Sequence, residues 1–174
     1  MSRARAGAYA AGLLAGWLGA CAHSDAPPPP RLSDFSSALH LRSVGAAPYS
    51  GTPAPGQVLL VTFLATWCFP CLGQLPLLEI EQKRHGVRGF QILAVGMDLE
   101  GAEVLEPFAR EYSLPFPLLV ADGAIRKGQT AFGPIPVLPA SFLFGRDGRL
   151  ITVFPGLLVP DELDQLIVRA LEAS

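Results

Sequence analysis

The sequence predicts a single α/β domain with a central mixed β-sheet flanked by helices. Short apolar, β-branched runs alternate with segments of helical periodicity, and the last two runs are separated by an Asp-Gly turn that is typical of a hairpin. Of the 174 residues, 50% are apolar and 16% are charged, which is enough nonpolar surface for one hydrophobic core. We therefore expect one domain, residues 31–174, after a distinct N-terminal region.

The first predicted strand and helix follow an irregular segment. Residues Arg31–Gln57 are rich in Gly, Pro and Ser, and we expect at most one hairpin there. Residues Val58–Leu64 form an unbroken apolar run, typical of a strand that is buried on both faces of a sheet. A helical spacing of apolar residues then extends to about Gly86, and its members are Leu72, Leu75, Leu78 and Ile80.

Three elements are predicted in the middle of the chain. Phe90–Met97 is a second buried strand, Glu103–Tyr112 a helix and Pro117–Ala121 a short strand. Pro107 would bend this helix or mark its true start, because proline lacks the N–H that a helix interior uses.

The C-terminal part is predicted to be a hairpin followed by a helix. Ala140–Phe144 and Leu150–Phe154 are strands joined across Gly145–Gly148. The last helix begins at Pro160 with two acidic residues near its positive end. Its apolar face consists of Leu163, Leu166, Ile167 and Leu171.

A Cys-x-x-Cys pair lies at the junction of the first strand and the helix. Cys68 would stand at the helix N-terminus, where exposed N–H groups and the macrodipole favour a thiolate. Because the thiolate is the species that attacks disulfides, we expect Cys68 to be the nucleophile. Cys71, one turn further on, would attack the resulting mixed disulfide and release the partner.

The residues around this pair resemble a known family. Phe63–Cys71 is similar to the active-site segment of thioredoxin-like proteins, and Ala-Thr-Trp-Cys-x-Pro-Cys is typical of their TlpA/ResA branch. Pro76 matches the family proline in the active-site helix. The resemblance implies a thioredoxin-like fold with the TlpA-type central βα insertion. Further similarities to this branch lie in Leu114–Pro117, Phe132–Gly133, Pro139–Leu143 and Asp147–Gly148.

The resemblance also implies a substrate-binding surface. In this family a cis proline lies against the active-site disulfide, and Pro139 occupies the matching place. The backbone of Leu138 would then pair with an extended substrate segment. Trp67, Phe69 and Pro70 would shape the rim of the site. An ordinary loop proline remains the alternative for Pro139.

The chain departs from the family pattern at three places. Gln74 stands where many relatives place a glutamate near the thiols, and Thr62 stands where thioredoxin has a buried aspartate. Neither side chain titrates, so neither can accept a proton from Cys71. The stretch from Phe132 to Pro139 is one residue longer than usual.

The sequence gives less support to other roles for the cysteine pair. The sequence has no second Cys-x-x-Cys, and its histidines are isolated, so neither a metal nor another cofactor is expected. A copper-delivery protein would need a wider cysteine spacing, and a peroxiredoxin would need a Thr-x-x-Cys pocket. A structural disulfide would close too small a ring to stabilise the fold well. The side chains predicted to be solvated are those of His23, His40, His85, Glu79 and Glu81.

Residues 1–20 are predicted to be a lipoprotein signal peptide. Two arginines precede an uncharged run rich in Ala, Gly and Leu that is too short for a membrane span. The run ends in Leu18-Gly19-Ala20-Cys21, which resembles the bacterial lipobox, in which the cysteine is acylated. Lipidation of Cys21 would also explain the odd number of cysteines. An ordinary signal peptide with an incidental cysteine is the alternative.

Residues 21–30 are predicted to be the lipidated cysteine and a stalk. The four prolines of Pro27–Pro30 favour an extended, semi-rigid polyproline II spacer. Ala22 follows the cysteine where many related inner-membrane lipoproteins carry aspartate, which favours the outer membrane. We therefore expect a protein anchored on the periplasmic side of a bacterial cell envelope. The net charge of −2, with scattered basic residues, gives no surface for nucleic acid.

These features together predict a membrane-anchored, extracytoplasmic thiol-disulfide oxidoreductase. The resemblance implies that it reduces disulfides in exported proteins, including apocytochromes, with electrons from a transmembrane thiol-disulfide carrier. The sequence does not fix the direction, because a potential depends on thiolate stability. The alternative is a lipid-anchored binding or holding module that uses the Leu138–Pro139 groove without redox turnover.

Overall fold

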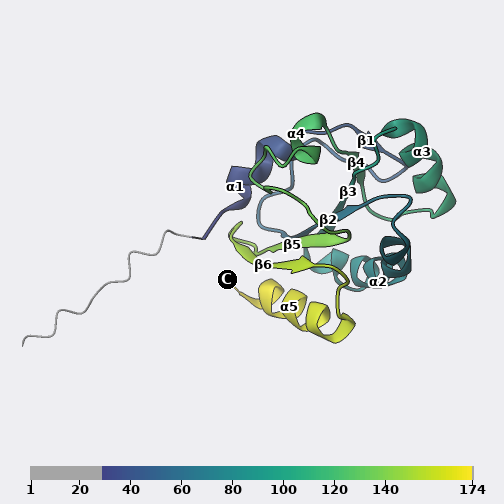
Figure 1. Ribbon diagram of the computed structural model, residues 1–174. Helices are drawn as coiled ribbons and strands as arrows, with labels where there is room; N and C mark the ends of the chain where they lie inside the picture. The colour runs from purple at the N-terminus through teal and green to yellow at the C-terminus, as the bar shows by residue number, and fades with distance from the viewer. Residues whose placement is uncertain (1–28, 174) are drawn as a thin grey trace, which may run out of the picture.

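A mixed β-sheet lies at the centre of the computed structural model, which describes residues 29–173 (Figure 1). Within these residues the sheet has six strands in the order β1-β4-β3-β2-β5-β6. Strand β2 pairs in parallel with β3 and antiparallel with β5. The strands are β1 (Ser43–Val44), β2 (Val58–Leu64), β3 (Phe90–Gly96), β4 (Leu118–Val120), β5 (Ala140–Phe144) and β6 (Leu150–Pro155).

Helices cover both faces of this sheet (Figure 1). No helix among residues 29–173 is long and apolar enough to cross a membrane. The predicted signal peptide, Cys21, His23 and most of the stalk lie outside the described residues. The helices are α1 (Leu32–Phe35), η1 (Ser36–Leu39), α2 (Phe69–His85), η2 (Gly86–Arg88), α3 (Ala102–Glu111), α4 (Gly123–Arg126) and α5 (Pro160–Glu172).

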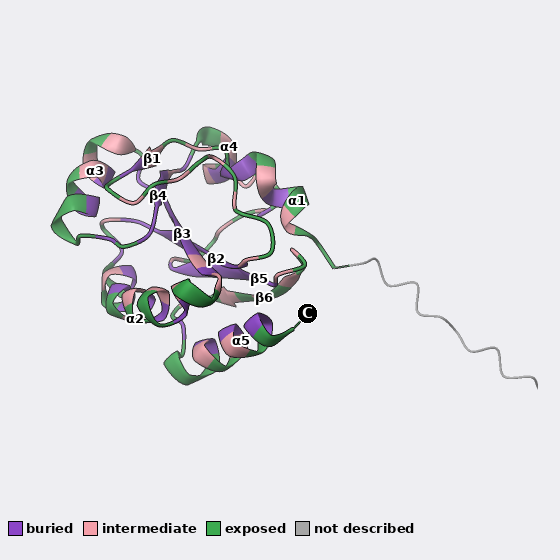
Figure 2. Ribbon diagram, turned by 180° about the vertical axis from the view of Figure 1, so that it is seen from behind, coloured by how far each residue is buried: buried purple, intermediate pink, exposed green. Residues whose placement is uncertain are grey.

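The apolar run of β2 is explained by burial on both faces. Every residue of β2 is buried, and alternate side chains enter different cores. Leu60 and Leu64 pack in a cluster with residues of α2, α3 and α5. Val61 and Phe63 pack in a second cluster with residues of α1, η1 and α4. Figure 2 shows the buried residues concentrated in the central strands and on the inner sides of the helices.

The predicted strands and long helices are confirmed to within about three residues at their ends. Pro107 lies inside α3, not at its start. The hairpin considered within Arg31–Gln57 is wrong, because this segment forms α1, η1 and the edge strand β1. Strand β1 pairs antiparallel with β4, with Ser43 opposite Leu119. Local sequence does not identify so distant a partner.

An aromatic cluster joins the N-terminal segment to the second core. The ring of Phe35 lies 4.8 Å from that of Phe132, which in turn lies 5.0 Å from that of Phe63. β5 contributes two more rings: that of Phe142 lies 5.1 Å from Phe132, and that of Phe144 lies 5.1 Å from Phe35. Such tilted and edge-on pairs add about 0.5–1.5 kcal/mol each beyond the area they bury. The cluster therefore fixes the start of the loop that leads to Pro139.

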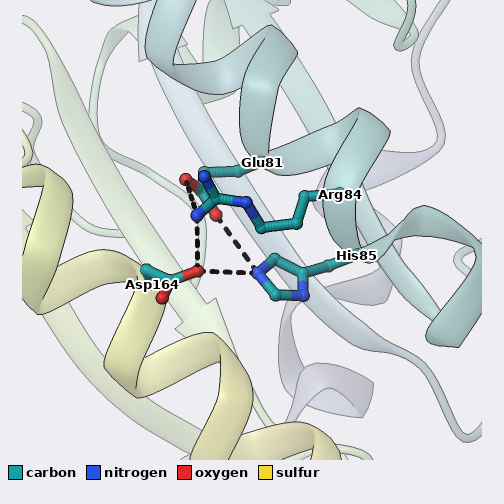
Figure 3. A network of polar contacts seen from close by, with 4 residues as sticks. All are labelled: Glu81, Arg84, His85 and Asp164. Carbon is teal, nitrogen blue, oxygen red and sulfur yellow. Dashed lines mark hydrogen bonds and ion pairs between the residues drawn. The ribbon is translucent and has the colours of Figure 1, made fainter.

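A polar network joins α2 to α5 (Figure 3). His85 Nε2 lies 2.8 Å from Asp164 Oδ1 and 3.3 Å from Glu81 Oε2. Arg84 Nη1 lies 2.9 Å from Asp164 Oδ1 and 3.5 Å from Glu81 Oε1. Burial raises the pKa of Glu81, whereas hydrogen bonds from His85 and Arg84 lower the pKa of Asp164.

The prediction that Glu81 and His85 are solvated is therefore wrong, since these residues are 2% and 3% exposed. With Leu78, they continue the buried face of α2 at helical spacing. Their partner Asp164 lies on another helix, and local sequence could not reveal it. His40 is exposed, as predicted, and Glu79 forms a surface ion pair with Lys83 at 3.5 Å.

Candidate active site

Cys68 and Cys71 form a disulfide at the start of α2, with their Cα atoms 5.2 Å apart. Cys68 is the N-cap residue of the helix, and its sulfur accepts a hydrogen bond from the backbone N–H of Cys71 at 3.2 Å. The first turn of α2 carries no acidic side chain. Backbone donors and the helix dipole are therefore available to stabilise a thiolate on Cys68 after reduction.

A groove of about 850 Å³ opens beside this disulfide. Cys68 lines it, but Cys71 does not, so the two sulfurs differ in access although both residues are buried. Trp67 and Phe69, on its rim, are 71% and 84% exposed. Exposed aromatic side chains next to a groove are typical of a binding surface. The lining residues are Trp67, Cys68, Phe69, Pro70, Met97, Leu99, Arg126, Ile135, Pro136, Val137 and Leu138.

Strand register brings the proline loop to the cysteine pair. Ala140, the first residue of β5, lies opposite Phe63 near the end of β2 that leads to Cys68. The peptide bond between Leu138 and Pro139 is cis, as the resemblance implies. Leu138 itself lines the groove, together with three other predicted substrate-binding residues. Pro139 does not line the groove itself, but it directly follows Leu138 in the chain.

Several lining residues were not predicted. Met97 and Leu99 follow β3, whose C-terminal end lies beside that of β2 because the two strands are parallel. Ligands of open α/β sheets commonly bind at such strand ends, which was a usable indication in the sequence. Arg126 comes from α4, a short helix that was not predicted. The Asp122 side chain caps that helix by accepting the Ile125 N–H at 2.8 Å.

Asp98 is a further residue that sequence reasoning missed. Its carboxylate accepts the backbone N–H of Thr66 at 3.1 and 3.2 Å, and the Thr66 hydroxyl at 2.5 Å. Asp98 is buried, with 1% of its surface exposed. A buried carboxylate therefore holds the segment that directly precedes Trp67 and Cys68.

Gln74 and Thr62, the two single residues that depart from the family pattern, are buried and hydrogen-bonded. Gln74 Oε1 accepts the backbone N–H of Leu158 at 2.9 Å. Thr62 Oγ1 accepts the Ser141 hydroxyl at 2.9 Å. Both partners are neutral, so no carboxylate stands at either position.

One group of side chains within residues 29–173 has the composition of a metal site: Glu81, His85 and Asp164, whose ligand atoms lie within 4.8 Å of one another. The expectation that His85 is isolated is thus wrong. Arg84 already places a positive charge against both carboxylates, which disfavours a cation there. His85 Nδ1 has no hydrogen-bond partner among the residues that the structure describes, whereas histidines that bind metals almost always donate their other ring N–H.

Comparisons with known proteins agree with this geometry. The chain is 28% identical over 109 residues to the thiol-disulfide oxidoreductase ResA of Bacillus cereus, covering 63% of this chain and 61% of the relative. It is 28% identical over 136 residues to the thioredoxin-like protein YneN of Bacillus subtilis, covering 76% and 74%. The chain thus spans about three fifths of the length of the first of these relatives.

Among solved structures, a thiol:disulfide interchange protein of the thioredoxin family from Chlorobium tepidum has the same fold. The TM-score is 0.61 at 23% identity, and the match covers 84% of this chain and 97% of that one. The thioredoxin-like fold expected from the sequence is therefore confirmed. A family model described as AhpC/TSA matches residues 37–153, more than half of the chain. The protein therefore belongs to the AhpC/TSA family and has a thioredoxin-like fold.

Proposed function

We propose that this protein is an extracytoplasmic thiol-disulfide oxidoreductase that reduces disulfides in exported proteins. The observation that carries the proposal is the Cys68–Cys71 disulfide at the N-terminus of α2, with Cys68 open to an apolar groove. The similarity to ResA of Bacillus cereus, a thiol-disulfide oxidoreductase, supports it.

The exchange would proceed in two steps. In the reduced protein, the Cys68 thiolate attacks one sulfur of a partner disulfide, and the other partner sulfur leaves as a thiolate that takes up a proton. Cys71 then loses its proton and attacks the Cys68 sulfur. This forms the Cys68–Cys71 disulfide and releases the second partner sulfur as a thiol. Two electrons pass to the partner, and the disulfide in the structure corresponds to the oxidised product.

The partner would bind as an extended segment along the groove. The backbone of Leu138 offers hydrogen-bonding groups beside Cys68, as the edge of a strand does. Trp67, Phe69 and Pro70, next to and within the cysteine motif, provide apolar contacts. The substrates would therefore be disulfides in segments that can straighten locally.

The position of the N-terminal segment is compatible with a lipid anchor at Cys21. The chain enters the domain beside the turn between β5 and β6: the Leu150 N–H donates to the Pro30 carbonyl at 2.9 Å. This turn lies at the end of β5 away from the active site, because β5 starts opposite Phe63 and ends opposite Leu59. A stalk anchored in the membrane, with the outer membrane favoured, would leave the groove free for exported partners and for a transmembrane thiol-disulfide carrier.

The alternative is a holding module that binds apolar segments without redox turnover. The exposed Trp67 and Phe69 favour it, because they would bind such a segment whatever the state of the cysteines. Insulin reduction driven by dithiothreitol separates the two functions. An oxidoreductase accelerates it strongly, and a variant with both Cys68→Ser and Cys71→Ser does not. A wild-type rate equal to that of dithiothreitol alone would favour the holding module.

A further inference from the structure

Asp98 combines deep burial with a position at the active-site turn. Of the carboxylates in the described part of the chain, those of Glu81 and Asp98 belong to buried residues. Glu81 lies in the α2–α5 network, whereas Asp98 follows the C-terminal end of β3, next to the end of β2 that leads to Cys68. Burying a carboxylate is costly unless donors surround it, so its contacts indicate what it stabilises.

The donors to Asp98 come from one residue of the turn. Thr66 directs its backbone N–H to both carboxylate oxygens and its hydroxyl to Oδ1. The same turn is closed by a bond from the Cys68 N–H to the Ala65 carbonyl at 3.0 Å. Just before it, the Met97 N–H donates to the Leu64 carbonyl at 2.8 Å. The end of β3 thus holds the end of β2 and the turn, up to the residue before Trp67.

The backbone of Asp98 adds a second link, to the other wall of the groove. Its carbonyl accepts the Gly101 N–H at 3.2 Å and Arg126 Nη1 at 3.4 Å. Arg126 also donates to the Ala121 carbonyl and lines the groove beside Cys68. The charged or titratable side chains that line the groove are therefore those of Arg126 and Cys68, and Arg126 also contacts the backbone of Asp98. Positions 62 and 74 are neutral.

We propose that Asp98 is a positioning residue for thiol-disulfide exchange, which holds the Thr66–Cys68 turn and keeps a negative charge beside it. The inference rests on the proposed function of the cysteine pair. An ionised aspartate only accepts hydrogen bonds, which matches the donors that Thr66 presents. Small displacements of a reacting group are costly, and an error of about 1 Å can lower a rate by about 100-fold. A fixed negative charge near a thiol also disfavours its thiolate.

Substitutions can separate the effect of the Thr66–Asp98 hydrogen bonds from the effect of the negative charge on Asp98. Thr66→Val removes the hydroxyl donor and keeps the charge, and Thr66→Ser restores a hydroxyl. Asp98→Asn removes the charge and turns one acceptor into a donor. Asp147→Asn is the control, because Asp147 also accepts a backbone N–H but does so in the turn between β5 and β6, at the end of β5 away from the cysteines. Rate constants with insulin and the pH profile of Cys68 alkylation in a Cys71→Ser background are the two readouts.

We expect Thr66→Val and Asp98→Asn to lower the rate constant about tenfold or more, and Thr66→Ser to recover most of it. Only Asp98→Asn should move the midpoint of Cys68 alkylation to lower pH, because it alone removes the opposing charge. Asp147→Asn should change neither readout. If Asp98→Asn does not fold, the threonine pair decides the positioning role.

A Thr66→Val variant with the wild-type rate constant would overturn the inference. An Asp98→Asn variant that keeps both the wild-type rate constant and the wild-type midpoint of Cys68 alkylation would also overturn it. An inactive wild-type protein would instead refute the proposed function, so the two failures are distinguishable.

Discussion

The side chain of Gln74 on the active-site helix accepts a hydrogen bond from the backbone N–H of Leu158, at 2.9 Å. This bond ties α2 to the loop that precedes α5. Gln74 is buried, and its carboxamide cannot take up the proton that Cys71 would lose in the proposed exchange. Position 74 should therefore contribute nothing to the pH dependence of the exchange proposed for this protein.

Substituting Gln74→Glu should create a titrating group near the thiols. Burial would raise the pKa of the new carboxyl, and its ionised form would raise the pKa of Cys71. We expect a new inflection in the pH–rate profile of disulfide exchange between about pH 5 and 9, measured by stopped flow. We also expect a loss of about 1–3 kcal/mol in the free energy of unfolding where the carboxyl is ionised.

Gln82→Glu is the matched control for this substitution. Gln82 lies on the same helix and also accepts a backbone N–H, from Ile92 at 2.9 Å, but it stands far from the cysteines in the helix. Its profile should match that of the wild type. Superimposable profiles for Gln74→Glu and the wild type would show that position 74 has no influence on the thiols.

The network between α2 and α5 predicts opposite pH effects for its two carboxylates. The pKa of Glu81 is raised in the folded state, so its contribution to stability is present at low pH and is lost as the pH rises through the folded-state pKa. The pKa of Asp164 is lowered, so its contribution is present at neutral pH and is lost as the pH falls through the folded-state pKa.

Glu81→Gln should therefore raise the melting temperature at pH 7, and this gain should vanish in acid. Asp164→Asn should lower stability at pH 7, by no more than about 1 kcal/mol for a pair that is partly exposed. Glu79→Gln, at the surface of the same helix, is the control. A Glu81→Gln variant that is less stable than the wild type at pH 7 would contradict this account, because it would mean that the ionised form is favoured.

The proposed lipidation of Cys21 predicts that anchoring and exchange activity can be lost separately. Cys21→Ser should move the protein from the membrane fraction to the soluble fraction. Exchange activity of the domain should stay unchanged, because the cysteine pair lies in a different part of the chain. Immunoblots of fractionated envelopes measure the first effect, and insulin reduction measures the second. Membrane association of the Cys21→Ser protein would contradict the proposed anchor.

The sequence predicts well those elements whose burial is indicated by the pattern of consecutive residues. The run Val58–Leu64 predicted a doubly buried strand, because only a central strand needs apolar residues on both faces. The position of the cysteine motif at the start of a helix was also predicted from neighbouring residues alone, since the motif directly follows a strand and precedes a helical pattern. By contrast, β1 has two residues, and its identity depends on pairing with β4.

The polar groups that sequence reasoning misjudged depend on distant partners. His85 is buried because Asp164 on α5 meets its ring, and Asp98 is buried because Thr66 donates to it. A charged residue in isolation indicates a solvated surface, and only the tertiary structure supplies the partner that reverses this interpretation. Most of the residues that line the groove were not predicted for the same reason, because they come from four separate segments of the chain.

The most direct test of the exchange mechanism is trapping of mixed disulfides in the cell envelope. Cys71→Ser leaves Cys68 able to attack but removes the residue that releases the partner, so it should accumulate adducts on non-reducing gels. Mass spectrometry of these adducts should identify exported proteins with disulfides. Cys68→Ser should trap nothing. The account predicts this asymmetry between the two variants, and either the reverse pattern or the absence of adducts in both would contradict it.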